Sequence, residues 1–252
     1  MATDIEHIVG QLRRVGLRPS DRQWEMIREA GMAAVEPVLA LALDVDTLGQ
    51  AEPASLGPVH ALRLLGELPP PQAEAIERLL RTQPPDAYRT SQAAYIWWQE
   101  LPQIVARLGR PGYEAARRVL LDQDAEAEQR AVAAESLSYM GEFDGALREE
   151  VTTLLRERLT AETDPYVMAH VVEALSNLGE ASAYGNIMAA YKCGAVDREI
   201  FSAADARQRL LNPKAAHVLE CVNHSLAERY DKHGPYTEEQ RRTMAENYLA
   251  SR

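Results

Sequence analysis

The sequence is poor in several features that would mark common protein classes. Its 252 residues include two phenylalanines and two cysteines, Cys193 and Cys221, and Lys and Arg together number 27 against 38 Asp and Glu. Two cysteines cannot form a disulfide framework, and their scarcity predicts a reducing compartment. The net charge of −11 opposes binding to phosphate backbones, so nucleic acid is an unfavourable partner by default.

Long apolar runs are also missing. No stretch approaches the ~20 apolar residues that a membrane-spanning helix needs. Asp4 and Glu6 precede any apolar run, unlike the basic start of a secretory signal peptide. We therefore expect a cytoplasmic protein without a membrane partner.

The sequence patterns that carry common catalytic chemistry are absent as well. The chain has no Gly-Lys pair and hence no Walker A loop, and it lacks G-x-G-x-x-G, H-E-x-x-H, C-x-x-C and G-x-S-x-G. We therefore predict no catalytic residues and no cofactor, and we favour a protein that is not an enzyme.

The chain does contain abundant alanine and leucine, which favour helices because both lose little conformational freedom there. One pattern recurs within the apolar runs. The residues ESLSYMGE at 135–142 return 38 positions later as EALSNLGE at 173–180, and a shorter form, ALRLLGE, stands at 61–67. Self-similarity at a period of tens of residues, inside helical patterning, predicts a solenoid of stacked helix pairs.

Apolar periodicity and helix start signals divide most of the chain into about six such pairs. The clearest start signals are the capping box Ser20-x-x-Gln23 and the N-cap Asp164 followed by Pro165. The predicted pairs are 21–30 with 34–43, 53–67 with 71–81, 103–108 with 113–121, 126–140 with 146–159, 166–178 with 183–191, and 198–211 with 213–230. An additional helix is predicted at 88–100, and Pro102 either kinks this helix or starts the next one. We thus predict a single all-α domain over 1–252, an α-α superhelix with a capping helix in 1–20, repeats over 21–230 and a last helix in 237–252.

The repeated motif resembles HEAT-like repeats, in particular the short bacterial kind of the phycobilisome lyases, whose first helix carries A-x-x-A-L-x-x-L-G. The matching residues are Ala134, Leu137, Met140 and Gly141, then Ala174, Leu175, Leu178 and Gly179, and earlier Ala61, Leu62, Leu65 and Gly66. The resemblance covers most of residues 21–211, unevenly. It implies an armadillo-like superhelix in which the second helix of each pair lines a concave face that commonly holds a partner protein.

This resemblance does not carry an activity over to the chain, because fold alone does not imply function. The di-iron hydroxylases of this architecture use His-Glu dipeptides, and no histidine here precedes a glutamate. The HEAT-like DNA glycosylases rely on a basic, aromatic-lined groove, whereas this chain is acidic. Nothing in the sequence marks the pigment site of a phycobilin lyase.

We therefore expect a non-catalytic scaffold or adaptor that binds another protein. One alternative is a lyase-like protein or other enzyme that holds a small ligand between repeats. A second is a nucleic-acid reader that uses a local arginine group. The last predicted helix could cap the repeats or pack against a second copy, so the sequence is consistent with a monomer and with a homodimer.

Aromatic residues at 88–98 are the first candidates for partner binding. On a helical wheel Trp97 lies in the apolar arc with Ala93, whereas Trp98 lies about 100° away, beside Tyr88 and Tyr95. Tyrosine and tryptophan dominate binding hot spots. Tyr88, Tyr95 and Trp98 are therefore candidate partner-binding residues, and the alternative is that they fill the space between repeats.

A group of arginines supplies further candidates: Arg107, Arg110, Arg117, Arg118 and Arg130. On an acidic chain such a group could hold an acidic peptide or a phosphate through bidentate contacts. The alternative is a solvated face with ion pairs one helical turn apart. Arg117 and Arg118 complete the predicted partner-binding set.

One metal-site candidate comprises His217, Cys221, His224 and Glu228. Their spacings of +4, +7 and +11 would place all four on one face of a continuous helix. Imidazole and thiolate suit zinc. No second element supplies further ligands, so an amphipathic helix is the favoured interpretation and we predict no metal.

Two further groups are interpreted as ordinary. His170 and Glu173 lie one helical turn apart, but no nucleophile is identifiable beside them. The acidic residues between Asp122 and Glu128 lack the glycine and the distal ligand of an EF-hand loop, and they suit a helix N-terminus.

Overall fold

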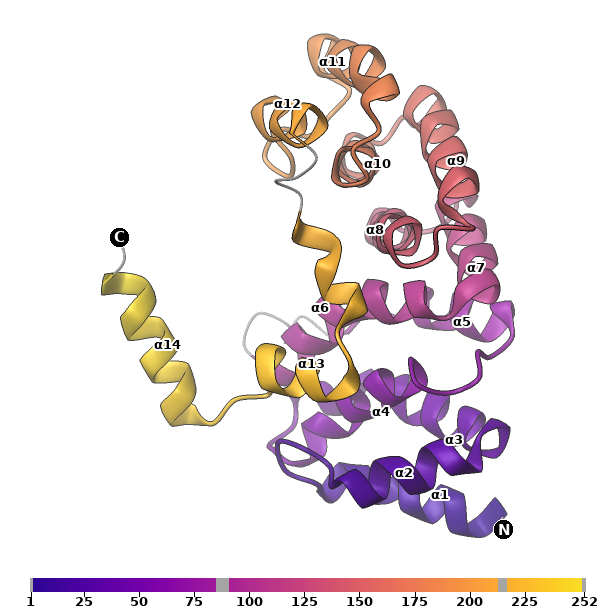
Figure 1. The fold of residues 1–252 in the computed structure, drawn as a ribbon, viewed down its shortest axis with the longest axis vertical. Helices are drawn as coiled ribbons and strands as arrows, with labels where there is room; N and C mark the ends of the chain where they lie inside the picture. Colours follow the sequence, from indigo (N-terminus) through magenta and orange to yellow (C-terminus); the bar gives the residue numbers. More distant parts are fainter. Residues whose placement is uncertain (1, 85–90, 213–216, 251–252) are drawn as a thin grey trace. The chain divides into compact units, whose positions relative to one another are not determined.

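The computed structural model describes residues 2–84, 91–212 and 217–250. All regular structure in these ranges is helical, and no strand is formed within them (Figure 1). The predicted all-α class is thereby confirmed. Within the same ranges no helix is both long and apolar enough to span a bilayer.

The chain divides into two compact units. Unit 1 comprises Met1–Leu68, Pro84–Trp98 and Ser225–Arg252, and unit 2 comprises Pro69–Gln83 and Gln99–His224. Helix α6 (Gln92–Arg107) begins in unit 1 and ends in unit 2. The predicted single domain of 1–252 stays a prediction.

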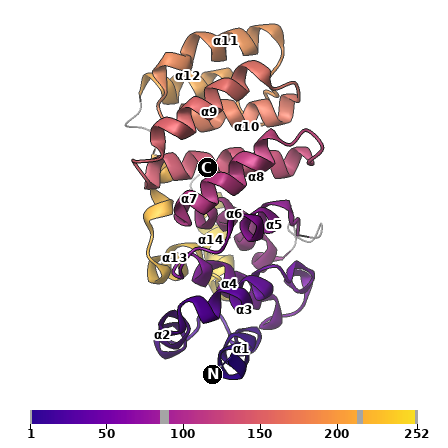
Figure 2. The same ribbon diagram turned by 90° about the vertical axis from the view of Figure 1, so that its right-hand side faces the viewer.

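Unit 2 is built from two rows of helices. One row contains α5 (Ala73–Arg81), α7 (Gly109–Leu121), α9 (Arg148–Ala161) and α11 (Tyr184–Cys193). The other contains α8 (Ala127–Phe143), α10 (Pro165–Asn177) and α12 (Ala203–Leu211). Figure 1 shows these rows side by side, and in Figure 2 the row with α7, α9 and α11 lies in front of the other. The contact of α8 with α10 is the most extensive in this unit, α5 packs on α7 in the other row, and α7 and α9 pack on α8 between the rows, so the apolar faces are buried both within the rows and between them.

Helix α10 starts where the sequence signals predict, whereas α7 begins at Gly109 and not at the predicted residue 113, and α12 begins at Ala203 and not at 198. The Asp164 side chain accepts hydrogen bonds from the backbone N–H groups of Tyr166 (2.9 Å) and Val167 (3.1 Å). Pro165 occupies the first helical position, where its missing N–H costs nothing. These two residues fix the beginning of α10 and hence the register of the side chains along it.

The motif residues Gly141 and Leu178 bring α8 and α10 together. Gly141 is buried inside α8, and a Cβ atom built on it would lie 3.0 Å from a Leu178 methyl. The sequence interpretation of Gly141 as the end of the helix is therefore wrong, because α8 continues to Phe143. Arg148 of α9 donates to the carbonyls of Gly141 (3.1 Å) and Leu178 (2.6 Å), so it ties together the ends of the two helices.

In unit 1 the C-terminal segment packs against N-terminal helices. The unit contains α1 (Ala2–Gly10), α2 (Asp21–Ala30), α3 (Met32–Ala42), α4 (Gly57–Leu65), α13 (Leu226–His233) and α14 (Glu238–Ala250). His60 of α4 donates from Nε2 to the Gly16 carbonyl (3.0 Å) and accepts at Nδ1 from the Tyr230 hydroxyl (2.7 Å). Burial lowers the pKa of His60 to about 3, so the ring is neutral. Arg63 stacks on the Tyr230 ring at 4.3 Å and donates to the Gly234 carbonyl (2.7 Å).

The predicted boundaries at Pro102 and at 213–230 also differ from the structure. The chain does not break at Pro102, because α6 is continuous and buried residues such as Leu101 and Ile104 hold it on both sides of the proline. The predicted helix 213–230 is instead a 3-10 segment, η7 (His217–Asn223), followed by α13. Ser225 ends the first element because its hydroxyl caps the new helix at the Glu228 N–H.

Gly112 lies in α7 at a close approach of two backbones in unit 2. A Cβ atom at this position would lie 2.4 Å from the carbonyl oxygen of Val105. We expect Gly112→Ala to lower the free energy of unfolding by roughly 1–3 kcal/mol, because the backbone must move to admit the methyl group. Denaturant unfolding followed by circular dichroism measures this change.

Gly185→Ala is the matched control. It lies exposed near the start of α11, and nothing stands within 4 Å of the added atom. Because alanine has a higher helix propensity than glycine, Gly185→Ala should leave the free energy of unfolding unchanged or raise it by up to ~1 kcal/mol. Equal unfolding free energies for the two variants would contradict the close approach at Gly112.

Candidate functional site

The predicted aromatic candidates lie on or next to α6. Trp97 is fully buried and donates from Nε1 to the Ala42 carbonyl (3.0 Å), whereas Trp98 is half-buried. The helical wheel therefore separates the two tryptophans correctly. Tyr95 is 57 % exposed, which leaves its ring available at the surface of unit 1. Tyr88 lies outside the described residues.

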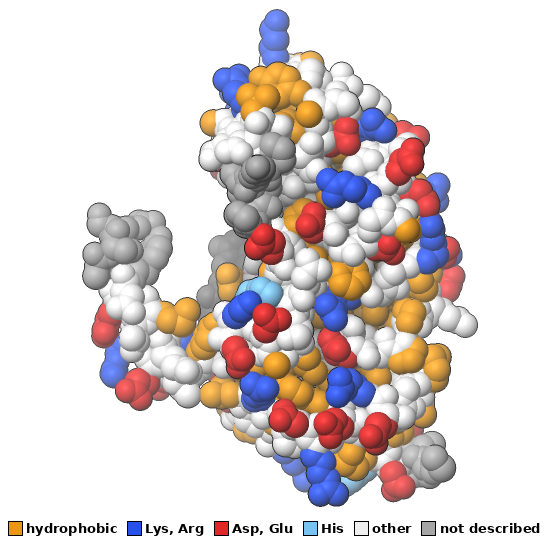
Figure 3. Space-filling model, viewed as in Figure 1, with side chains coloured by type: hydrophobic (Ala, Val, Ile, Leu, Met, Phe, Trp, Pro, Cys, Tyr) orange, Lys and Arg blue, Asp and Glu red, His pale blue; other side chains and the backbone are white. Residues whose placement is uncertain are grey.

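Most of the predicted arginine group is held by partners inside unit 2. Arg110 forms two hydrogen bonds of 2.7 Å to Glu150, Arg118 pairs with Glu74 at 2.7 Å, and Arg107 donates to a backbone carbonyl. Arg130 is buried against a glutamate. Arg117 is exposed and forms no ion pair within the described ranges. Figure 3 shows acidic and basic side chains interspersed on one face of the molecule.

The predicted metal candidates do not share a helix face. Cys221 belongs to η7, His224 follows it, and Glu228 lies in α13, so the continuous helix that would align them does not exist. The side chain of His217 lies outside the described residues. Glu228 accepts from the Ser225 N–H (2.9 Å) and from Lys232 (3.1 Å), and these contacts lower its pKa to about 2. The described residues contain no group of three or more acidic, histidine or cysteine side chains placed to hold a metal ion.

A groove lies between α7 and α9 in unit 2. It has a volume of about 400 Å³ and is lined by Tyr113, Arg117, Ala146, Glu149, Glu150, Thr153, Leu154 and Glu157. Glu150 is paired with Arg110, whereas Glu149 and Glu157 form no ion pair in the part of the chain that the structure describes. The groove is therefore mainly acidic, with one arginine and one aromatic ring.

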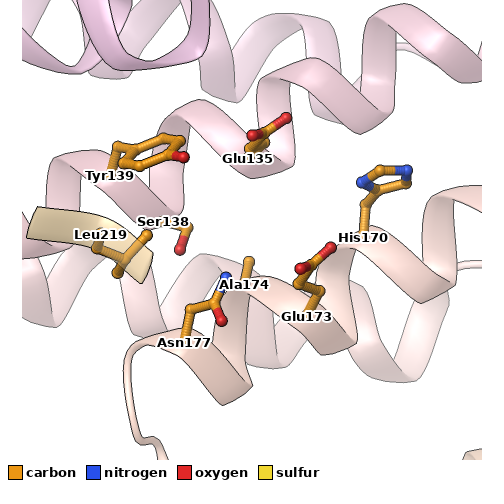
Figure 4. A pocket seen from close by; sticks show the side chains of 8 residues that line it. All are labelled: Glu135, Ser138, Tyr139, His170, Glu173, Ala174, Asn177 and Leu219. Carbon is orange, nitrogen blue, oxygen red and sulfur yellow. The ribbon is translucent and has the colours of Figure 1, made fainter. Parts of the chain in front are cut away.

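A smaller and more enclosed pocket lies between α8 and α10. Its volume is about 40 Å³, which suffices for a group of a few heavy atoms. Figure 4 shows side chains of α8 facing side chains of α10 across it, with Leu219 of η7 at one side. The lining residues are Glu135, Ser138, Tyr139, His170, Glu173, Ala174, Asn177 and Leu219.

The two carboxylates of this pocket have different electrostatic environments. Glu173 is paired with Arg209 of α12 at 3.1 Å. Glu135 has no ion pair among the described residues, and burial together with the charge of Glu173 raises the pKa of Glu135 to about 8. Glu135 thus lacks the positive partner that Glu173 has, and it is largely protonated at neutral pH.

Glu162 shows how unit 2 stabilises a buried carboxylate elsewhere. Burial alone would raise its pKa, but the backbone N–H of Asp164 and the Arg158 side chain donate to it, and Arg130 lies against it. The pKa of Glu162 is lowered as a result. No comparable donors surround Glu135 in the described part of the chain, so the polar groups of the α8–α10 pocket are left partly unsatisfied.

Two neutral polar groups lining the pocket are also unpartnered. The hydroxyl of Ser138 is buried, with the residue 1 % exposed, and the Nε2 atom of His170 is buried too; neither has a hydrogen-bond partner among the residues that the structure describes. Burial lowers the pKa of His170, against the opposing effect of Glu173, so its ring is neutral and offers one acceptor nitrogen. The Tyr139 hydroxyl lies 3.9 Å from the Cys221 sulfur.

The repeat itself builds this pocket. Glu135 and Glu173 are equivalent positions of the 38-residue repeat, as are Tyr139 and Asn177. Stacking α8 on α10 therefore sets one acidic position against its copy. In the sequence Glu135 stands out only as part of an architectural motif, and Glu173 is interpreted as ordinary. The signal that could have identified them is an acidic residue repeated on a helix face that neighbouring repeats bury.

Comparisons with known proteins add no family and no activity. No family model matches the chain, and no curated protein matches it. A crystal structure of an engineered protein from a structural genomics consortium aligns with 19 % identity over 87 % of this chain and 97 % of the other, with a TM-score of 0.34. So low a TM-score carries no conclusion about this protein.

The raised pKa of Glu135 makes stability depend on pH. Between the ordinary value of 4.5 and about 8, the folded protein holds a proton that the unfolded chain releases, so stability falls as pH rises through this window. Glu135→Gln removes this dependence. We expect the variant to match the wild type near pH 4.5 and to be more stable at pH 8.5 by roughly 1–3 kcal/mol, allowing for solvent in the pocket.

Urea unfolding at a series of pH values tests this expectation. Glu128→Gln, an exposed position at the start of the same helix, is the matched control and should follow the wild type throughout. A stability difference between Glu135→Gln and wild type that does not change with pH would show that Glu135 ionises normally.

Proposed function

We propose that the protein is a non-catalytic cytoplasmic scaffold or adaptor built from HEAT-like helix pairs, and that it binds a partner protein through unit 2. The α7–α9 groove is the observation that supports this function. It lies between consecutive second helices of the repeated pairs and contains Arg117, one of the residues that the sequence marks for partner binding.

The charges of the groove indicate the chemistry of the partner. Glu149 and Glu157 are exposed acids that form no ion pair among the described residues, and they outnumber the single unpaired cation, Arg117. Opposite charges across an interface steer association and select partners. A segment with basic residues for the two glutamates and an acidic group for Arg117 fits this groove, and the Tyr113 side chain adds apolar contact area.

The nucleic-acid alternative receives less support from the same residues. A phosphate-binding patch needs several arginines that are not already neutralised. Arg110 and Arg118 are paired with glutamates, and Arg130 is buried in an ion pair. The acids that line the groove would repel a phosphate backbone.

Charge reversal within the groove tests the proposal. We expect Glu149→Arg/Glu157→Arg to weaken capture of a specific partner from native extract by roughly tenfold or more, because the complementary charges are inverted. Glu25→Arg/Glu29→Arg makes the same change of charge on exposed positions of α2 and should retain the partner. Quantitative mass spectrometry of the captured proteins provides the measurement, with helicity checked for each variant.

A photo-crosslinking residue at exposed Thr153 adds a direct readout, because Thr153 lines the groove. The partner that the charge reversal loses should be the protein that crosslinks there. A Tyr95→Ala/Trp98→Ala variant separately tests the α6 aromatic residues. If both charge-reversed variants retain the partner and no crosslink forms at Thr153, the partner binds outside the groove. If the wild type captures no specific partner, the adaptor proposal is wrong.

A further inference from the structure

We infer that the α8–α10 pocket is a binding site for a primary ammonium group. This site is distinct from the α7–α9 groove and independent of the proposed adaptor function. The polar groups that line the space between α8 and α10 support it, together with the partners that some of those groups already have.

The first step concerns charge. Glu135 and Glu173 face the same small space, and the structure supplies one cation, Arg209, which pairs with Glu173 at 3.1 Å. Glu135 has no positive partner within the described ranges. A buried carboxylate without a partner is costly, so it either takes up a proton or binds a cation. The pocket therefore has room for one additional positive charge beside Glu135.

The second step concerns hydrogen bonds and is independent of charge. The Ser138 hydroxyl is buried and unpartnered, and it faces the space between α8 and α10 in Figure 4. The unpartnered Nε2 of His170 lines the same space. An ammonium group offers three N–H donors. The Glu135 carboxylate is an acceptor for it, and the Ser138 oxygen and the His170 nitrogen are further acceptors along the same pocket.

Other occupants fit less well. An anion would meet two carboxylates, and a water molecule would satisfy the hydroxyl and the imidazole but supply no positive charge to the ionised form of Glu135. The described residues hold no set of ligands arranged for a metal ion. A guanidinium is planar and larger, whereas a pocket of about 40 Å³ accommodates a compact head group. The same ammonium chemistry is present in a free small amine and in a lysine side chain of another polypeptide.

Binding of the cation must be coupled to loss of the proton from Glu135. The titratable groups that face this carboxyl are Glu173 and His170 on α10 and Tyr139 on α8, with Cys221 of η7 beside Tyr139 and Arg209 held by Glu173. His170 is neutral because burial lowers its pKa, and burial raises the pKa of Tyr139, so neither changes charge between pH 7 and 9. The pKa of Glu135 is about 8, so the fraction ionised, and hence the affinity, should rise about tenfold from pH 7 to pH 9.

The test titrates the intact protein in amine-free buffer with two probes, methylammonium chloride and the lysine derivative N-acetyl-lysine-N-methylamide, with sodium chloride as the ionic-strength control. Carbon-13 NMR follows the Glu135 carboxyl. We expect saturable binding, a fall of about one unit or more in the pKa of Glu135 at saturation, and about tenfold tighter binding at pH 9 than at pH 7. These readouts use the wild type, so they hold even if a variant does not fold.

Variants and probes then separate the remaining outcomes. Glu135→Gln should abolish binding, Ser138→Ala should weaken it, and Glu128→Gln should leave it unchanged. Equal affinity for both probes identifies a site for free amines, whereas binding of the lysine derivative alone identifies a site for a lysine side chain. A Glu135 titration curve that neither probe moves beyond the sodium chloride control, or binding that persists in Glu135→Gln, overturns the inference.

Discussion

The packing of α8 against α10 is the interaction on which the described site depends. Gly141 has no side chain, so Leu178 can approach α8 closely, and Arg148 ties the carbonyl ends of both helices to α9. Because the two helices carry the same motif, this contact stacks equivalent positions on one another. The pairing of Glu135 with Glu173 across a pocket is a direct consequence of that register.

Local signals in the sequence specify the local structure of unit 2. The cap at Asp164, the apolar stripes and the repeated motif each act over a few residues, and the structure places helices where these signals predict them. Contacts between distant segments carry no such signal. The return of Tyr230 to His60 in unit 1 joins positions 170 residues apart, and no pattern in either segment predicts it. The continuity of α6 through Pro102 likewise depends on burial on both sides of the proline.

The candidate sites differ in how far the sequence could predict them. The sequence places Arg117 in a group of arginines. The acids that lie near it in the groove come from α9, and only the packing of α7 on α9 makes them its neighbours. Glu135 belongs to the repeated motif, but its raised pKa depends on the lack of a positively charged partner, which the motif does not show. Its repeat copy, Glu173, is neutralised by Arg209 from a later helix, and this arginine has no equivalent beside Glu135 in the described residues.

That asymmetry bears on why Glu135 is present. Unit 2 provides two arginines for the buried Glu162 and one for the partly exposed Glu173. A glutamine at 135 would occupy a similar volume without the desolvation that a carboxylate suffers at neutral and higher pH. A side chain that breaks a local rule without a compensating contact is characteristic of functional positions rather than structural ones. The Ser138 hydroxyl and the His170 Nε2 atom, which have no hydrogen-bond partner among the described residues, line the same pocket as Glu135, where a cationic ligand would complete these groups.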